Sequence, residues 1–174
     1  IKIKKGSTNE LFNLAQEYSF ELCQPSTLKK NTSWILLRHK SGYKIRYSNF
    51  VEVMCPLFSN KALVNCLHTF SYSKSGWGLD FLWASIISEN IGIIDSIVIE
   101  HTKEMNLKGG TLYKKLLEET GKTPKEELDE LVIKYNLNVE TCITNIMYQD
   151  SPMGWFRFLF DKIDLIKKHI LNNR

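Results

Sequence analysis

The chain has 174 residues, of which 43% are hydrophobic and 11% are aromatic. That length is enough for one domain with a core of its own, and too short for two domains of ordinary size. The 23 basic and 19 acidic residues give a formal net charge of +4, and the basic ones are scattered along the chain. A scattered, mild charge argues against a dedicated nucleic-acid surface, so we expect no nucleic-acid partner.

Cysteine usage and hydropathy indicate the setting of the protein. The 4 cysteines show no Cys-x-x-Cys spacing, which favours a reduced, cytoplasmic protein over a disulfide scaffold. No apolar run approaches the ~20 residues that span a bilayer. The first residues do not resemble a signal segment either. We therefore expect a cytoplasmic protein whose membrane contact, if any, is peripheral.

Helices and short strands alternate in the first third of the chain. The run Ser7-Thr8-Asn9-Glu10 matches a capping box and predicts a first helix. Residues 20–24 are expected to form a strand that Pro25 stops. Two more strands, over 34–38 and 43–53, are predicted on either side of a glycine-containing turn. Together these two strands would form a hairpin.

The middle of the chain has the strongest local signals. Ser59 is the expected N-cap of a short helix that runs to residue 67. Two glycines flank Trp77 and let the backbone turn sharply before a mostly apolar helix over 79–87. The run over 91–99 is rich in isoleucine and bounded by polar residues, which is typical of a buried strand.

The last third is expected to be helical. One helix is predicted over 111–120, and a second begins after Thr123 with a capping box and Pro124 at its first position. The segment 155–171 is an amphipathic helix. Its apolar side carries Phe156, Leu159, Phe160, Ile163, Ile166 and Ile170. This helix either lies on a membrane surface or packs on the domain or a partner, and two acidic residues on its polar side favour packing.

A candidate site emerges from Asp80 and His101. Asp80 falls in the first turn of the predicted 79–87 helix, where the helix dipole favours a carboxylate and would keep it ionised. His101 follows the predicted buried strand. Ligands bind at the carboxyl ends of strands in open α/β sheets, so these two side chains form a plausible site there. The alternative is a helix-capping Asp and a structural His, and spacing alone leaves both interpretations open.

Glu52 and Asp95 are acidic residues within predicted strands. A buried carboxylate is costly unless it is paired. Glu52 is therefore a site residue or the partner of Arg46 or Lys44, unless strand alternation turns it to solvent. Asp95 interrupts an isoleucine-rich run, and we expect a backbone or basic group to hold it in a structural role.

Three other residues have both a functional and a structural interpretation. The ring of Trp77 can stack on the apolar face of a sugar, or it can simply anchor the turn between its two glycines. Asn49 can orient substrate hydroxyls or belong to a turn. Gln24, before Pro25, would lie at a strand end from which it can reach an acceptor.

Separate blocks of the sequence resemble a known family. They are Leu22-Cys23-Gln24-Pro25-Ser26, Asn49 to Ser59, Ser75-Gly76-Trp77-Gly78-Leu79-Asp80, and Ile93-Ile94-Asp95-Ser96 with His101-Thr102. In this order they resemble an uncharacterised glycosyltransferase-like family of bacteria and plants, and more distantly they are similar to GT-A-type glycosyltransferases. The resemblance covers about residues 10 to 117. It implies an α/β fold: 1–110 as the acceptor-side, C-terminal part of a GT-A-like nucleotide-diphospho-sugar transferase fold, and 111–174 as a helical C-terminal extension packed on it.

The resemblance also implies a reaction. A sugar would pass from a nucleotide-sugar donor to an unknown carbohydrate or glycoconjugate acceptor, with a divalent metal, Mn or Mg, as cofactor. Asp80 would be the catalytic acidic residue and His101 a metal ligand. The expected substrate-binding residues are Trp77, Gly78, Glu52, Asn49 and Gln24.

One departure from the GT-A pattern matters. Those enzymes hold the metal and diphosphate with an Asp-x-Asp or Asp-Asp-Asp cluster, which these 174 residues lack, and the chain opens with Ile1. We therefore expect the nucleotide-binding half to lie outside this chain. A non-catalytic carbohydrate-binding or scaffold domain that uses Trp77 and Glu52 is the alternative, and nucleotide binding separates the two. A third reading is a metal-dependent hydrolase that uses Asp80 and His101.

Overall fold

The structure is a computed structural model that describes residues 1–4, 6–28, 32–102 and 111–172. The strands are β1 (Lys2–Ile3), β2 (Leu22–Thr27), β3 (Tyr43–Ser48), β4 (Leu57–Phe58), β5 (Ile91–Glu100) and β6 (Ile143–Tyr148). The α-helices are α1 (Ser7–Glu17), α2 (Asn60–Cys66), α3 (Leu79–Ile87), α4 (Thr111–Thr120), α5 (Pro124–Tyr135) and α6 (Pro152–Asn172). Two short 3-10 helices, η2 (Ile35–Leu37) and η3 (Leu67–Ser71), complete the described elements.

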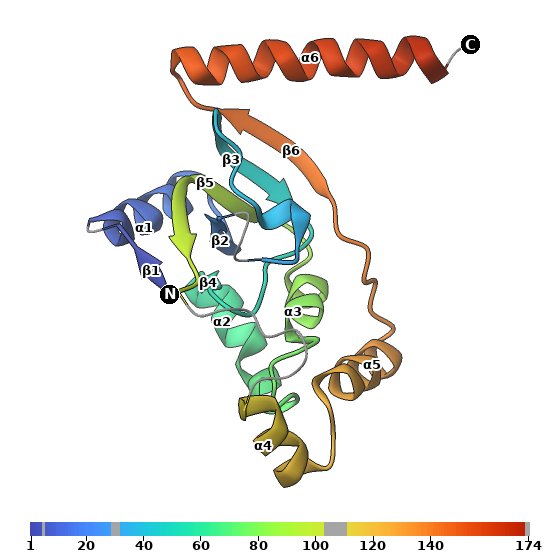
Figure 1. The fold of residues 1–174 in the computed structure, drawn as a ribbon. Helices are drawn as coiled ribbons and strands as arrows, with labels where there is room; N and C mark the ends of the chain where they lie inside the picture. Colours follow the sequence, from blue (N-terminus) through green and yellow to red (C-terminus); the bar gives the residue numbers. More distant parts are fainter. Residues whose placement is uncertain (5, 29–31, 103–110, 173–174) are drawn as a thin grey trace.

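The strands form one six-stranded mixed sheet in the order β4-β2-β5-β3-β6, with β1 paired to the end of β5. The pairing of β2 with β5 is parallel, whereas β5 with β3 and β3 with β6 are antiparallel. The ten-residue β5 lies at the centre and contacts three strands. The predicted α/β class is therefore confirmed (Figure 1).

Both faces of the sheet are covered. Neighbouring residues of a strand point to opposite faces, so Leu22 and Ile93 join one core while Cys23 and Ile94 join the other. The first core includes residues of α3 and α5, and the second includes Leu11 of α1. The long apolar run of β5 is explained by this burial on both faces.

Strand β2 continues through Pro25, which we expected to stop it. Proline has no N–H to donate, so it is tolerated only where a strand has no neighbour on that side. Strand β4 pairs only with Leu22 and Cys23 and ends before Pro25. The register between β2 and β5 also shifts between Pro25 and Ser26. The prediction that Pro25 ends the strand was wrong because β4 is too short to require a hydrogen bond from Pro25.

The predicted hairpin over 34–53 is also absent from the described residues. The segment 34–38 contains η2, and β3 pairs with β5 and β6 instead. The guanidinium of Arg46 donates hydrogen bonds to the carbonyl groups of Leu36 and Arg38, at 2.5 and 2.9 Å. A side chain thus satisfies carbonyls that a strand partner would otherwise have to satisfy.

The predicted helix starts had different outcomes. Ser59 caps α2 by accepting a hydrogen bond from the N–H of Ala62, and Thr123 forms the predicted capping box with Glu126 at the start of α5. The capping box predicted at Ser7 is wrong. The chain enters α1 through Gly6, whose φ is +85°, so Ser7 is already inside the helix and caps nothing.

The last third contains a strand that we did not predict. Strand β6 lies within the segment expected to be helical, and it forms the edge of the sheet beside β3. The expected boundary at residue 110 lies outside the described residues. Helix α6 follows β6 and lies across one end of the sheet (Figure 1). Among the described helices, none combines the length and apolar character needed to cross a bilayer.

Candidate functional site

Asp80 is positioned by a tight turn at the start of α3. Gly78 has a φ of +89°, which favours glycine, and is the residue before the first turn of α3. A β-carbon at this position would lie 3.0 Å from Leu131 Cδ1 and 3.2 Å from Leu128 Cα. Helix α5 therefore packs directly against the turn and fixes where α3 begins. The structural role of Gly78 is close packing.

A second anchor of the turn is Glu127, which the sequence analysis did not identify. Its carboxylate accepts hydrogen bonds from the hydroxyl groups of Ser73 and Ser75 and from the N–H groups of Lys74 and Ser75, at 2.5 to 3.0 Å. Burial alone would raise the pKa of Glu127, but these hydrogen bonds lower it. The signal was present, because Glu127 precedes the core residue Leu131 by four positions and so lies on the same side of α5.

Asp80 is buried, with 6% of its surface exposed. Its Oδ1 accepts a hydrogen bond from the N–H of Phe81 at 3.0 Å, while Gly78 occupies the capping position. Burial raises the pKa of Asp80 to about 6, against the lowering effect of the backbone N–H groups of Phe81, Asp80 and Gly78. From the sequence we expected the helix dipole to keep Asp80 ionised; desolvation, which that expectation did not consider, outweighs the N–H groups and raises the pKa.

Glu52 lies close enough to Asp80 for the charge of Asp80 to act on it. The alternative in which Glu52 pairs with Arg46 or Lys44 is wrong, because Arg46 binds Asp95 and Lys44 binds Glu17. Burial, followed by the charge of Asp80, raises the pKa of Glu52 to about 7. Its Oε2 is buried and has no hydrogen-bond partner among the described residues. Glu52 is therefore an incompletely satisfied acid next to a second acid.

Gln24 sets the backbone of Glu52. Its Oε1 accepts a hydrogen bond from the N–H of Glu52 at 2.7 Å, and its side chain is fully buried in β2. Its Nε2 donates to the carbonyl of Pro25 at 3.2 Å, so backbone groups engage both ends of the amide and Gln24 is a positioning residue. The structure thus brings together Gln24, Glu52 and Asp80, three of the predicted site residues, from β2, the segment after β3 and the start of α3.

Glu52 and Asp80 both have pKa values raised toward neutral pH. Their pKa values of about 7 for Glu52 and about 6 for Asp80 put their titration close to neutral pH. A general acid or base works best when its pKa lies near the working pH. Perturbed carboxyls of this kind are found at functional sites more often than elsewhere. The pair is therefore suited to accept a proton from a hydroxyl group.

Trp77 is 40% exposed at the tip of the turn, three residues before Asp80. Its indole N–H donates a hydrogen bond to the hydroxyl of Tyr113 at 3.3 Å, and the two rings meet edge to face. The backbone N–H of Trp77 donates to the hydroxyl of Ser75 at 3.2 Å. The ring is thus oriented by α4 while keeping exposed surface that a sugar ring can contact.

The structure places Asn49 in a different setting. Its Nδ2 donates to the carbonyl of Glu140 and its Oδ1 accepts from the N–H of Cys142, each at 2.7 Å. These bonds tie the end of β3 to the segment that leads into β6. Both ends of the amide are engaged by backbone, so we leave Asn49 out of the proposed site.

His101 follows Glu100, the last residue of β5, and is half-buried. In the described part of the chain, no group of three or more His, Cys, Asp or Glu side chains gathers in a way that could hold a metal ion. A single imidazole does not hold a hard divalent ion, which prefers several oxygen ligands. These residues by themselves therefore do not make a complete metal site.

Asp95 has the partner that the sequence predicted. Arg46 donates to both carboxylate oxygens of Asp95, at 2.5 and 3.0 Å, and the N–H of Lys40 adds a third bond at 3.0 Å. His39 and Ser26 complete this buried network, but both Asp95 and Ser26 face the same imidazole nitrogen, Nδ1. A catalytic triad needs the acid and the nucleophile on opposite ring nitrogens. The network is structural.

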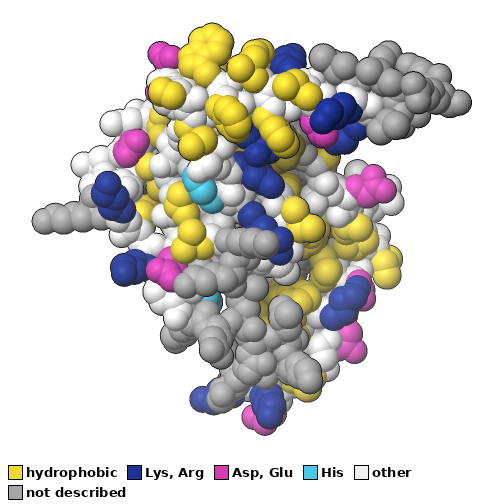
Figure 2. Space-filling model, turned by 45° about the horizontal axis from the view of Figure 1, so that its top comes forward, with side chains coloured by type: hydrophobic (Ala, Val, Ile, Leu, Met, Phe, Trp, Pro, Cys, Tyr) yellow, Lys and Arg dark blue, Asp and Glu magenta, His cyan; other side chains and the backbone are white. Residues whose placement is uncertain are grey.

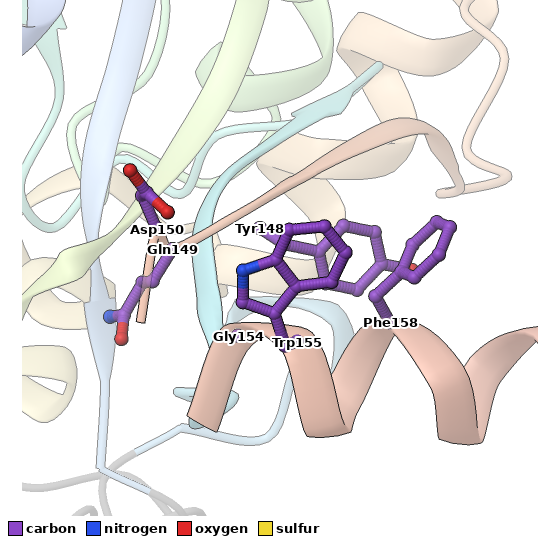
Figure 3. Close-up of a pocket in the computed structure, with 6 residues that line it drawn as sticks. All are labelled: Tyr148, Gln149, Asp150, Gly154, Trp155 and Phe158. Carbon is purple, nitrogen blue, oxygen red and sulfur yellow. The ribbon is translucent and has the colours of Figure 1, made fainter. Parts of the chain in front are cut away.

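A hollow of about 270 Å³ lies between β6 and the start of α6 (Figure 3). Tyr148, Trp155 and Phe158 contribute aromatic rings, and Asp150 points away from these rings. Only one titratable acid lines the hollow, so it lacks the paired groups that acid-base chemistry needs. We therefore take the Glu52–Asp80 pair as the candidate site.

Comparison with protein families gives one match. A family described as "Protein of unknown function (DUF707)" matches residues 29–146, which is more than half of the chain. The chain belongs to the DUF707 family. No protein with a curated description and no solved structure matches it.

The DUF707 match includes Glu52, Trp77, Asp80 and His101. Gln24 lies before the matched segment, and α6 lies after it. The carboxyl pair and the turn beside it thus fall inside the family region. The family description states no activity, so the function has to be argued from the site.

Proposed function

We propose that this chain forms the acceptor-side part of a glycosyltransferase, which moves a sugar from a nucleotide-sugar donor to a carbohydrate or glycoconjugate acceptor. The observation that carries the proposal is the carboxyl pair, Glu52 and Asp80, with pKa values of about 7 and about 6. A base with a pKa near the working pH is the most efficient at removing the proton of a sugar hydroxyl.

In the proposed reaction Asp80 takes the proton of the acceptor hydroxyl. The acceptor oxygen then bonds to the anomeric carbon of the donor sugar, and the bond from that carbon to the diphosphate breaks. Glu52, the weaker acid of the two, carries a proton for much of the time at neutral pH and orients the acceptor by hydrogen bonding. Trp77 offers its exposed ring to the apolar face of a sugar.

A divalent metal, Mn or Mg, would neutralise the departing diphosphate. His101 is the proposed ligand on this chain, and the remaining ligands would come from residues outside the described ones. Substituting His101→Ala in the protein expressed from its complete gene should weaken the dependence of activity on Mn, with partial rescue at raised Mn concentration.

The test of the proposal is Asp80→Asn in the same complete protein. The amide keeps the size of the side chain, so the fold should persist while transfer falls about 10²-fold or more, as expected when a positioned base is lost. Release of the nucleoside diphosphate with a panel of sugar acceptors measures this. The matched control is Asp129→Asn on the exposed side of α5, which should leave turnover unchanged.

The second candidate function is carbohydrate binding without catalysis. The exposed ring of Trp77, oriented by Tyr113, favours it. Calorimetric titration with nucleotide sugars and with oligosaccharides separates the two candidates. Glycan binding that depends on Trp77, together with no turnover of any nucleotide sugar, would replace the transferase proposal by the binding one.

A further inference from the structure

Helix α6 attaches to the domain by its polar side. The carboxylate of Asp161 accepts hydrogen bonds from the hydroxyl groups of Tyr43 and Tyr148, at 2.7 and 3.1 Å. Arg157 pairs with Asp161 at 3.1 Å and lies over the ring of Tyr43. A β-carbon on Gly42 would meet Arg157 Cβ at 2.7 Å, so the helix sits directly on the turn before β3. This close docking fixes which side of α6 faces outward.

The outward side of α6 is apolar. Successive residues of an α-helix are rotated by about 100°, so five large side chains fall on the side opposite Asp161. They are exposed by 52 to 69% and we call them the outer face: Trp155, Phe156, Leu159, Phe160 and Ile163. Figure 2 shows hydrophobic side chains along the upper part of the molecule, where α6 lies. From the sequence we favoured packing of this helix on the domain or a partner, and these side chains do not pack on the domain.

Lysines border the outer face on both edges. By the helical rotation, Lys162 lies next to Trp155 on one edge, where its Nζ is 5.5 Å from the centroid of the Phe158 ring, and Lys167 lies next to Phe160 on the other. Both lysines are exposed. Lys and Arg side chains appear among the apolar ones in Figure 2. The outer face is thus an apolar stripe with positive margins.

The acidic residues of α6 do not offset these lysines. Asp161 is turned toward Tyr43 and Tyr148, and Asp164 pairs with Lys168 at 3.0 Å. The two acids that favoured packing over a membrane surface in the sequence are therefore engaged elsewhere. If two copies of the chain met through their outer faces, Lys162 and Lys167 of one copy would approach those of the other. The outer face carries no acidic residue that could pair with them. An anionic surface has the complementary charge.

We infer that the outer face of α6 binds an anionic lipid surface. The helix lies parallel to the bilayer, its apolar side chains enter the boundary between head groups and acyl chains, and Lys162 and Lys167 meet the lipid phosphates. Helix α6 lies at one end of the molecule, away from α3 and α5 (Figure 1). The surface that carries Trp77 therefore stays accessible when α6 is bound.

Flotation with lipid vesicles tests this inference directly. We expect the chain to bind vesicles of phosphatidylcholine and phosphatidylglycerol (7:3) at least about 10-fold more tightly than vesicles of phosphatidylcholine alone, since each lysine near an anionic surface contributes about 1 kcal/mol. Raising the salt concentration should reduce this preference.

Leu159→Glu, at the centre of the outer face, should lower binding to the mixed vesicles about 10-fold or more. The matched control is Ile133→Glu on α5, where the side chain is 81% exposed and far along the chain from α6. It should bind as the wild type does. The double substitution Lys162→Glu and Lys167→Glu should remove the preference for anionic lipid. Circular dichroism confirms that each variant is folded.

Three results would overturn the inference. They are equal binding to both vesicle types, unchanged binding of Leu159→Glu, and a lipid-free dimer that Leu159→Glu dissociates in light-scattering measurements. The last result would assign the outer face to a second copy of the chain. None of these measurements involves a nucleotide sugar, so they stand or fall independently of the transferase proposal.

Discussion

Two buried acidic regions of this protein differ in what surrounds them. Asp95, in β5, accepts hydrogen bonds from two guanidinium nitrogens of Arg46 and from the N–H of Lys40. Glu52 instead feels the negative charge of Asp80, and Glu52 Oε2 lacks a hydrogen-bond partner among the described residues. The carboxylate of Asp95 is therefore paired with a cation, whereas the carboxyl group of Glu52 is not.

The electrostatic consequences follow from this difference. Burial raises the pKa of Asp95, but the Arg46 guanidinium opposes that rise. Burial raises the pKa of Glu52 to about 7, and the charge of Asp80 adds to the rise. A fold that only needed stability would gain by pairing or removing Glu52. A buried acid with a strongly raised pKa is found at functional sites more often than elsewhere.

The largest expected effect comes from breaking the satisfied region. Arg46→Met leaves Asp95 buried without its partner and frees the carbonyl groups of Leu36 and Arg38. We expect the free energy of unfolding, measured with urea, to fall by about 3–5 kcal/mol. Lys44→Met on the same strand is the control. It breaks the exposed pair with Glu17 and the contact of the ammonium with the Tyr18 ring, and should cost less than about 1 kcal/mol.

Substituting Glu52 is expected to increase the stability of the fold at high pH. Because folding raises the pKa of Glu52 from 4.5 to about 7, the folded state loses stability as the pH rises through this window. Glu52→Gln removes that loss. We expect the variant to unfold at higher urea than the wild type at pH 8, by about 1–3 kcal/mol, and the difference to shrink toward pH 4.5.

Glu10→Gln provides the control for this pH dependence, because Glu10 is exposed on α1. Its stability should follow that of the wild type at every pH. If Glu52→Gln destabilised the protein at pH 8, the carboxylate of Glu52 would have to be satisfied in the folded state. The contrast with Asp95 would then be lost.

A smaller effect is expected at the anchor of the turn. Glu127→Gln keeps the shape of the side chain, but its amide nitrogen cannot accept the hydrogen bonds that Ser73, Lys74 and Ser75 donate. We expect a loss of about 1–2 kcal/mol at pH 7. Since the pKa of Glu127 is lowered in the fold, the wild type should lose the same contribution as the pH falls below 4.5.

The control for Glu127 is Glu130→Gln in the same helix. Glu130 pairs with Lys122 at the surface, so its change should cost less than about 0.5 kcal/mol. Equal stabilities of the two variants would show that Glu127 does not hold the turn. The fluorescence of the tryptophans, including Trp77, reports whether the turn has moved.

The sequence by itself determined the elements whose signals are local. The caps at Ser59 and Thr123, the apolar helix α3 and the isoleucine-rich β5 were all predicted, because capping and burial patterns act within a few residues. The need of Asp95 for a basic or backbone partner was also predictable, since an unpaired charge inside a strand is costly.

Only the tertiary structure decided the rest, because the deciding partner lies far away in the chain. Pro25 is tolerated inside β2 because β4 ends before it. Residues 34–38 do not form the predicted strand, and the side chain of Arg46 donates hydrogen bonds to two of their carbonyl groups. Glu52 meets Asp80 across 28 positions of sequence, and no local pattern encodes that meeting. The sequence showed that α6 is amphipathic, but the bonds from Tyr43 and Tyr148 to Asp161 determined which side faces outward.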